Sequence, residues 1–188
     1  MKISKILKNN TVWVSSDHHF GHANILTFKT SSGEPLRPWT DLNEMEEELI
    51  ARWNSVVKPH DYIIHCGDFS MNRDGYVRTI GRLNGRKILI MGNHDTLSID
   101  TYLKHFEYVT SMIVLHHRAI LTHIPIHPAS IGSGMVNIHG HLHDFDVLLD
   151  NQPDLRYISA CVEKHNFYPV NVNDLIQNAK VVLNQNIS

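Results

Sequence analysis

The chain has 188 residues, of which 42% are hydrophobic, and we expect it to fold as one compact domain over residues 1–188. Its 17 Lys and Arg against 19 Asp and Glu give a formal net charge of -2, which excludes a protein that attracts polyanions through its overall field. Any contact with nucleic acid must then come from a local patch, and we do not expect extended nucleic acid as a partner.

The N-terminal sequence and the cysteine content both favour a cytoplasmic protein. Residues 1–10 interrupt their apolar positions with lysines, so we expect neither a signal peptide nor a membrane span, and no membrane partner. The two cysteines, Cys66 and Cys161, are too few for a disulfide scaffold and lie in apolar runs. We expect both thiols to be reduced and buried.

Apolar runs of strand length recur along the chain, and most of them end just before a polar motif. Continuous apolar runs bounded by Gly or Asp are typical of strands buried on both faces. They cover residues 12–14, 62–64, 88–91, 112–115, 119–121 and 136–138. The sequence thus predicts at least these strands.

Helical patterns separate several of these runs. Apolar spacing predicts a helix over residues 41–57, capped by Thr40 or Asp41. Weaker patterns predict helices over residues 76–83, 99–106 and 175–183. Strands that alternate with helices predict an α/β domain, whose site forms at the carboxyl ends of the strands.

Histidine is unusually frequent, with 15 in the chain, and many lie beside Asp, Asn or Gly. Neutral imidazole is the commonest metal ligand and titrates near neutral pH, so this composition favours a metal site or acid–base chemistry. We expect four histidines to be ordinary surface residues: His60, His105, His116 and His117.

Four short motifs and His123 follow the predicted strands. The motifs are Asp17-His18-His19, Gly67-Asp68, Gly92-Asn93-His94-Asp95 and Gly140-His141-Leu142-His143. Carboxylate, imidazole and amide groups of this kind bind divalent cations. The candidate ligands are Asp17, His19, Asp68, Asn93, His123, His141 and His143.

The spacing of these ligands indicates two cations. Residues two apart at a strand end point to the same side, so Asp17 and His19 can bind one ion while His18 turns away. His141 and His143 repeat this spacing. Asp68 is a candidate to bridge two ions roughly 3.5–4 Å apart. The positive charge of two divalent cations exceeds the negative charge of two carboxylates and a bridging hydroxide, so such a site attracts and polarises a phosphate.

The residues that follow Asn93 are candidates for catalysis. His94 lies beside a ligand, and we expect it to protonate the leaving oxygen as the hydroxide attacks phosphorus in line. Asp95 either orients His94 or forms the N-cap of a following helix, and the sequence favours neither.

The ordered motifs over nearly the whole chain resemble those of the calcineurin-like metallophosphoesterase superfamily. The segments 16–25 and 136–143 are similar to those of its small bacterial and bacteriophage members. The resemblance implies two packed mixed β-sheets flanked by helices, a four-layer αββα sandwich. It also implies that Asp68 is shared between two metals. One metal is then held by Asp17, His19, Asp68 and His143, and the other by Asp68, Asn93, His123 and His141.

Departures from the superfamily's other branches narrow the expected substrate. Ser/Thr protein phosphatases carry a second Asp three residues after the bridging one and then Arg-Gly, whereas residues 68–73 here read Asp-Phe-Ser-Met-Asn-Arg. This disfavours a phosphoprotein substrate. The length leaves no room for the added domains of a large repair nuclease. The candidate substrate contacts are His22, Asn24, Arg37, Arg73 and His127, and the loops 27–38 and 125–134 either line the site or are plain solvated loops.

The function expected from these features is a metal-dependent phosphoesterase acting on a small phosphodiester or phosphomonoester, with nucleotides among the candidates. We expect Mn as the metal, with Fe, Ni or Zn as alternatives. One competing hypothesis is a nuclease for short or single-stranded ends, with Lys29, Arg37 and Trp39 as its platform, although the sequence favours a core role for Trp39 equally. Another is a non-catalytic scaffold, as in the retromer subunit that resembles this superfamily. The location implied is the cytoplasm of a bacterium, or of the host of a phage.

Overall fold

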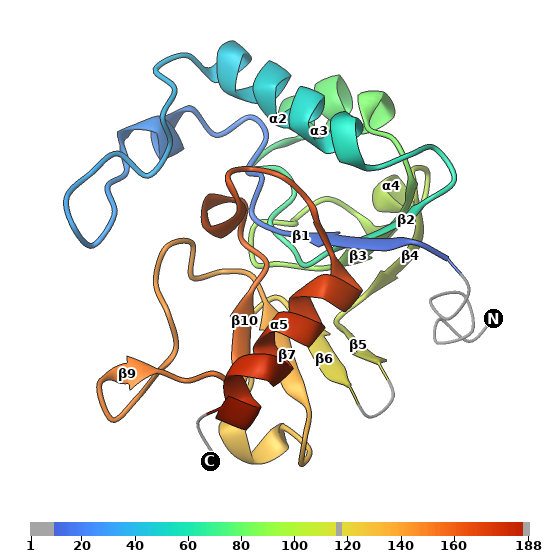
Figure 1. Cartoon of the computed structure of the whole chain (residues 1–188). Coiled ribbons are helices and arrows are strands. Elements are labelled where there is room, and N and C mark those ends of the chain that lie inside the picture. The colour runs from blue at the N-terminus through green and yellow to red at the C-terminus, as the bar shows by residue number, and fades with distance from the viewer. Residues whose placement is uncertain (1–9, 116–117, 186–188) are drawn as a thin grey trace.

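The fold is built on two β-sheets, as a computed structural model of the chain shows (Figure 1). The structure describes residues 10–115 and 118–185, so the N-terminal segment, His116 and His117 lie outside it. The larger sheet has the strand order β11-β1-β2-β3-β4, with β11 antiparallel to β1 and the other pairs parallel. Its strands are β1 (Val12–Ser15), β2 (Tyr62–His65), β3 (Arg86–Ile90), β4 (Phe106–Thr110) and β11 (Val170–Asn171).

The smaller sheet is also mixed. Its order is β10-β7-β6-β5, in which β5 runs antiparallel to β6 and the other pairs are parallel. A short hairpin, β8 (Leu148–Leu149) and β9 (Gln152–Pro153), follows β7. The sheet's strands are β5 (Met112–Leu115), β6 (Ala119–Thr122), β7 (Val136–His139) and β10 (Tyr157–Ser159).

Helices were predicted with uneven success. α2 (Leu42–Val56) begins where expected, because the side chain of its N-cap Asp41 accepts a hydrogen bond from the Glu44 N–H. α3 (Arg73–Thr79) continues into a 3₁₀ turn at Ile80–Arg82, and α5 (Val172–Gln185) is longer than predicted. The helix expected over residues 99–106 is wrong in its second half: α4 covers Ile99–Tyr102 alone, and residue 106 already begins β4.

Two apolar layers hold these elements together. The layer between the sheets joins apolar side chains of β1, β2 and β3 to those of β5, β6 and β7, and α5 contributes Val172, Leu175 and Ile176. The second layer lies between the larger sheet and the helices α2, α3 and α4, which cover its outer face (Figure 1). Two packed mixed sheets with flanking helices confirm the predicted fold class.

Trp53 anchors the helix layer. Its side chain is fully buried, and its indole N–H donates to the Asn84 carbonyl at 3.0 Å. We expect Trp53→Ala to lower the free energy of unfolding by about 3–5 kcal/mol, because the large ring leaves a cavity that the rigid layer cannot close. Urea unfolding followed by fluorescence measures this, and a loss below ~1 kcal/mol would contradict the assignment.

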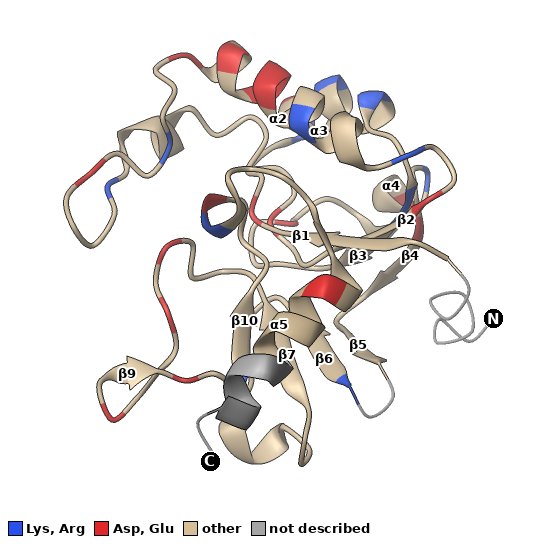
Figure 2. Ribbon diagram, in the orientation of Figure 1, with Lys and Arg blue, Asp and Glu red and all other residues tan. Residues whose placement is uncertain are grey.

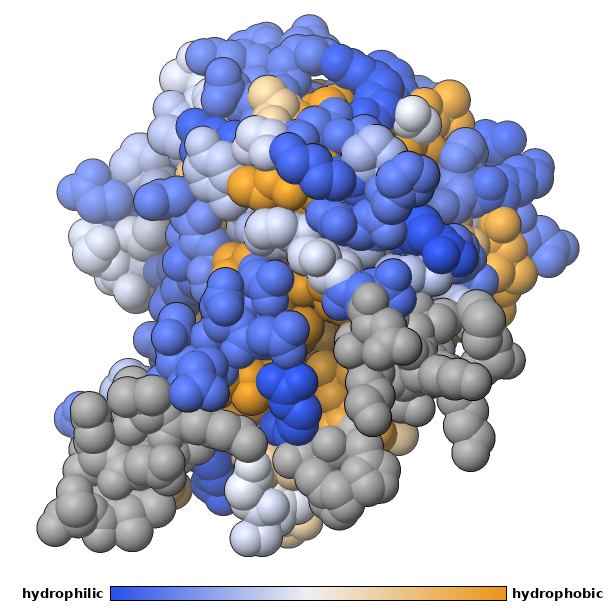
Figure 3. Space-filling model, turned by 45° about the vertical axis from the view of Figure 1, so that its right-hand side comes forward, coloured by the Kyte–Doolittle hydropathy of each residue, from blue (hydrophilic) through white to orange (hydrophobic). Residues whose placement is uncertain are grey.

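The surface carries scattered apolar groups. Hydrophilic residues cover much of the face in Figure 3, and hydrophobic ones show between them in patches.

Among the helices of the described residues, none is both long and apolar enough to cross a membrane. His60 and His105 are exposed as predicted, and Cys66 and Cys161 are buried free thiols, also as predicted.

Candidate metal centre

The candidate ligands gather where strands of both sheets end. Asp17, Asp68 and Asn93 follow the parallel strands β1, β2 and β3, and the candidate histidines His123 and His141 follow β6 and β7. The side chains form two groups, within each of which the ligand atoms lie within 4.8 Å of one another. The first ligand group is Asp17, His19 and His143, and the second ligand group is Asp68, His123 and His141.

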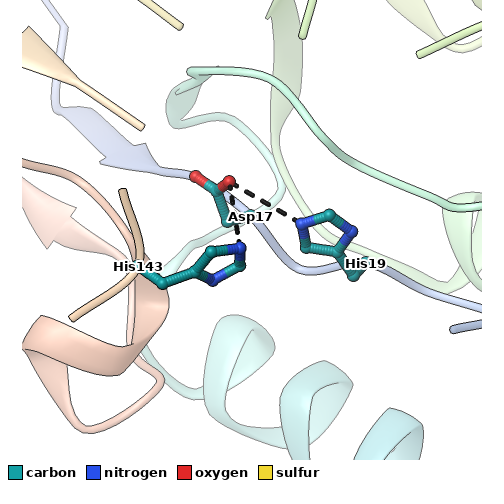
Figure 4. A group of neighbouring side chains, drawn as sticks. All are labelled: Asp17, His19 and His143. Carbon is teal, nitrogen blue, oxygen red and sulfur yellow. Dashed lines mark ion pairs between the residues drawn. The ribbon is translucent and has the colours of Figure 1, made fainter. Parts of the chain in front are cut away.

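In the first ligand group, the side chains of Asp17 and His19, from one turn, lie close to that of His143, from a distant segment (Figure 4). The Asp17 Oδ1 atom lies 3.7 Å from His19 Nε2 and 4.0 Å from His143 Nε2. The Asp17 carboxylate is buried and accepts hydrogen bonds from the His141 N–H at 2.9 Å, the Cys161 thiol at 3.3 Å and the Ser16 hydroxyl. These donors fix its orientation.

Electrostatics keep Asp17 ionised despite its burial. Burial alone would raise its pKa, but the nearby His19 ring and the charges of His143 and His123 together lower the pKa of Asp17 well below its usual range. The carboxylate is therefore available as an anionic ligand.

In the second ligand group, polar atoms converge on the ring of His123. Its Nε2 atom lies 3.4 Å from Asp68 Oδ2, 2.9 Å from Asn93 Oδ1 and 3.2 Å from His141 Nδ1. The other ring nitrogen, Nδ1, is 2.8 Å from the Cys66 carbonyl oxygen. Because a carbonyl only accepts, Nδ1 carries a proton, and Nε2 is the ring atom that would bind a metal.

Asp68, a member of the second ligand group, also lies close to the first. Its Oδ2 atom is 3.6 Å from His19 Nε2 and 3.4 Å from His123 Nε2, while Oδ1 accepts from the His94 N–H at 2.8 Å. From this position one carboxylate could contact a cation in each group.

The backbone conformation at the candidate ligands also favours a bound cation. Five candidate ligands adopt left-handed φ angles between 52° and 72°, a conformation that costs a non-glycine residue about 1–3 kcal/mol. They are Asp17, His19, Asp68, His141 and His143. Both ring nitrogens of His19 are also buried without a hydrogen-bond partner among the described residues. Divalent cations bound by carboxylate, imidazole and amide groups would compensate for both costs.

These left-handed angles show that the geometry predicted for Asp17 and His19 was wrong in one respect. Strand alternation was expected to place Asp17 beside His19, but β1 ends at Ser15 and the ligands lie beyond it in left-handed turns. The two residues do share a group, and His18 does turn away. Its ring lies in the core with Nδ1 2.8 Å from His65 Nε2, and burial lowers the pKa of both rings.

Two glycines allow the backbone to approach the ligands closely. A Cβ atom at Gly92 would overlap the Asp68 carboxylate, and one at Gly140 would lie 2.5 Å from Asp17 Oδ2. Any larger residue at either position would displace a carboxylate.

Asp95 has neither of the roles considered from the sequence. Its buried carboxylate accepts hydrogen bonds from the N–H groups of Asp68 at 2.8 Å, Phe69 at 3.0 Å and Gly92 at 2.8 Å. Burial raises its pKa to about 6, although the three N–H donors oppose the shift. The side chain that caps α4 belongs to Ser98. Asp95 is therefore a positioning residue for the two loops that carry Asp68 and Asn93.

Arg37 was expected to contact substrate, and the structure corrects this. Its side chain has no exposed surface and lies 2.7 Å from a carboxylate oxygen of Glu163. The guanidinium also donates to the carbonyls of Asp17 at 2.6 Å and His18 at 3.3 Å. Trp39 is likewise buried, against Phe167, so it has the core role and does not form a platform.

The other candidate substrate contacts differ in their surroundings. The ring of His22 lies 5.4 Å from that of His19, and its Nδ1 atom is buried without a partner among the described residues. His127 is exposed, and its Nδ1 atom accepts from the Ala129 N–H at 3.2 Å. Asn24 and Arg73 are exposed. Of the five candidates, His22 is thus the one that the structure places in ring contact with a ligand.

The loops were left open by the sequence, and one of them reaches the site. In the loop 27–38, the Ser31 N–H donates to Asp144 at 3.0 Å, next to the ligand His143. The loop 125–134 contains a 3₁₀ turn at Pro128–Ser130 and is tied to β7 by the Ile126 N–H, which donates to Asn137 at 3.1 Å.

Sequence reasoning missed Glu163. Its Oε1 atom lies 2.9 Å from His143 Nδ1, and its side chain is 4% exposed. No local motif marks it, because it lies 20 positions after its histidine partner and on a different element, the 3₁₀ turn Val162–His165.

Comparison with known proteins agrees with this geometry. The model of the calcineurin-like phosphoesterase family matches residues 11–179. An uncharacterized protein of Methanocaldococcus jannaschii is 29% identical over 91% of this chain and 94% of its own length. The Gene 66 protein of Mycobacterium phage L5 is 26% identical over 71% of this chain and 78% of its own.

A solved structure is also similar. The crystal structure of a protein of unknown function from Aquifex aeolicus superposes with a TM-score of 0.61 and 26% identity, over 88% of this chain and 97% of that one. With the family model matched over most of its length, the chain belongs to the calcineurin-like phosphoesterase family.

Proposed function

We propose that the protein is a two-metal hydrolase of small phosphodiesters or phosphomonoesters, with nucleotides as candidate substrates. The observation that carries this proposal is that the Asp68 carboxylate of the second ligand group also lies 3.6 Å from His19 of the first. When bound, two divalent cations would neutralise phosphate charge and lower the pKa of a water molecule that attacks phosphorus. Mn is the metal we expect, since carboxylate, imidazole and amide ligands suit it.

His94 is the proposed general acid. Its backbone N–H is bonded to Asp68, and its ring lies 5.3 Å from the ring of His19, so it borders the first ligand group. The ring is half-buried, and among the described residues its nitrogens have no hydrogen-bond partner. A ring held in place by its backbone and free at both nitrogens can donate a proton to a leaving oxygen.

The surroundings favour a compact substrate. Arg37 and Trp39, two of the three residues of the predicted nuclease platform, are buried. Figure 2 shows Asp and Glu on the segment that leads from β7 to β9 and on α2, whereas Lys and Arg lie on α3 and around α4. A continuous basic groove would be needed to track a nucleic-acid backbone, and this distribution disfavours one.

The test is hydrolysis with Mn²⁺ added to chelated protein. We expect kcat/KM for a chromogenic phosphodiester or a nucleotide to exceed that for a phosphoserine peptide by about tenfold or more, equivalent to ~1.4 kcal/mol of transition-state stabilisation. The physical reason is that residues 68–73, which begin at the candidate bridging residue Asp68, lack the second Asp and the Arg-Gly of protein phosphatases.

Three results would revise the proposal. A preference for the phosphopeptide would overturn the substrate class. Affinity for single-stranded oligonucleotides that falls steeply with salt would favour the nuclease. Absence of any metal-dependent turnover would favour a scaffold.

A further inference from the structure

A buried ion pair joins three segments beside the first ligand group. Arg37 lies between the 3₁₀ turn Ala23–Thr27 and α2, and Glu163 lies near the C-terminal end of the described chain, 126 positions later. The guanidinium Nη2 and Nε atoms are 2.7 and 2.9 Å from Glu163 Oε1, and the two side chains are 0% and 4% exposed. Charged groups this deeply buried call for a physical reason.

One side of the pair fixes the ring of His143. Glu163 Oε1 lies 2.9 Å from His143 Nδ1. The same oxygen lies 2.7 Å from Arg37 Nη2, so the Glu163 carboxylate is the anionic partner of an ion pair and accepts hydrogen bonds. Nδ1 therefore carries a proton, and the Nε2 lone pair is directed toward the first ligand group, where Nε2 lies 4.0 Å from Asp17 Oδ1.

The other side of the pair holds the backbone of the facing ligands. Arg37 donates to the carbonyls of Asp17 at 2.6 Å and His18 at 3.3 Å. Asp17 has a φ of 59° and His19 one of 52°, so Arg37 binds a turn whose backbone is costly. A single guanidinium thus connects the Asp17 turn to the carboxylate that orients His143.

Stability alone does not explain the pair. Buried ion pairs contribute little net stability, because the desolvation cost offsets the attraction. The second carboxylate oxygen of Glu163 is buried with no hydrogen-bond partner among the described residues, which adds to that cost. A group retained at such a cost fits a role in orienting its neighbours.

The second ligand group is oriented in a different way. The Nδ1 atom of His123 donates to the Cys66 carbonyl, so a backbone group, and not a charged side chain, holds the Nδ1 side of that ring. We propose that Glu163 and Arg37 are positioning residues for the first ligand group alone, which makes the two metal sites unequal. This inference rests on the proposed function.

The test is calorimetric titration of the chelated protein with Mn²⁺. We expect wild type to bind two equivalents and Glu163→Ala to lose about 10–100-fold in affinity at one site while the other is unchanged. Glu163→Gln should fall between them, because its amide oxygen still accepts the Nδ1 proton but the charge is gone. The glutamine variant also serves if the alanine variant does not fold.

The matched control is Asp154→Asn. Asp154 is another buried carboxylate in an arginine pair, 2.6 Å from Arg156, on the segment between β9 and β10. The Asp154→Asn variant should leave both Mn²⁺ affinities unchanged. The melting temperatures of all variants show whether a loss of affinity merely follows a loss of stability.

Several outcomes would overturn the inference. These are equal weakening of both sites, no weakening in Glu163→Ala, or a loss that appears in Asp154→Asn as well. Wild type that binds fewer than two Mn²⁺ would overturn both this inference and the proposed function. Wild type that binds two Mn²⁺ without hydrolysing any phosphoester would overturn the proposed function alone, and a selective loss in Glu163→Ala would still support the positioning pair.

Discussion

Replacing Asp68 with Asn is expected to abolish turnover and to lower the occupancy of both metal sites. Asp68 Oδ2 lies within 3.6 Å of a histidine nitrogen in each ligand group, so removing its charge weakens two sites at once. The loss of activity should exceed the roughly 10–100-fold typical when an outer hydrogen-bond partner of a ligand is removed. Elemental analysis and steady-state kinetics measure the two effects.

The control for this variant is Asp74→Asn, which removes an exposed carboxylate in the first turn of α3. It should retain two metals and full activity. Two metals per chain in Asp68→Asn would exclude the shared position of Asp68.

His94→Ala is expected to keep both metals and the fold but to lower kcat by about 10²–10⁴-fold on substrates with poor leaving groups. The loss should shrink for nitrophenolate, which departs with little protonation. Comparing the two leaving groups at saturating Mn²⁺ separates proton donation from substrate binding.

An exposed histidine provides the comparison. His60→Ala removes a solvent-facing ring and should change neither rate. If His94→Ala slows both leaving groups equally, the ring binds phosphate or positions the nucleophile and does not donate the proton.

Much of the fold could be predicted because its main strands are continuous apolar runs. β2 is buried along its whole length, and such a run has few alternatives to a central strand. The short strands β8 and β9 escaped prediction because both are exposed and two residues long, too short for any period to show.

Candidate ligands could be read from the sequence for a similar reason. Asp and His are costly to place at the ends of buried strands unless they bind something, so their positions mark a site. Arg37 and Glu163 could not be read in this way, because their pairing joins segments 126 positions apart and only the folded chain brings them together. Asp95 was misjudged because its partners are backbone groups, which sequence patterns do not reveal.

The left-handed turns at the ligands limit how such a centre can be transplanted. Asp and His belong to the few residue types that tolerate positive φ. The residues that supply the donor atoms here therefore also adopt the left-handed backbone conformation of the turns. Grafting Asp17 and His19 onto an extended strand of another scaffold would keep their order and spacing but aim their donors in other directions. A designer would have to copy the turn, with its glycines and its buried anchors, before copying the ligands.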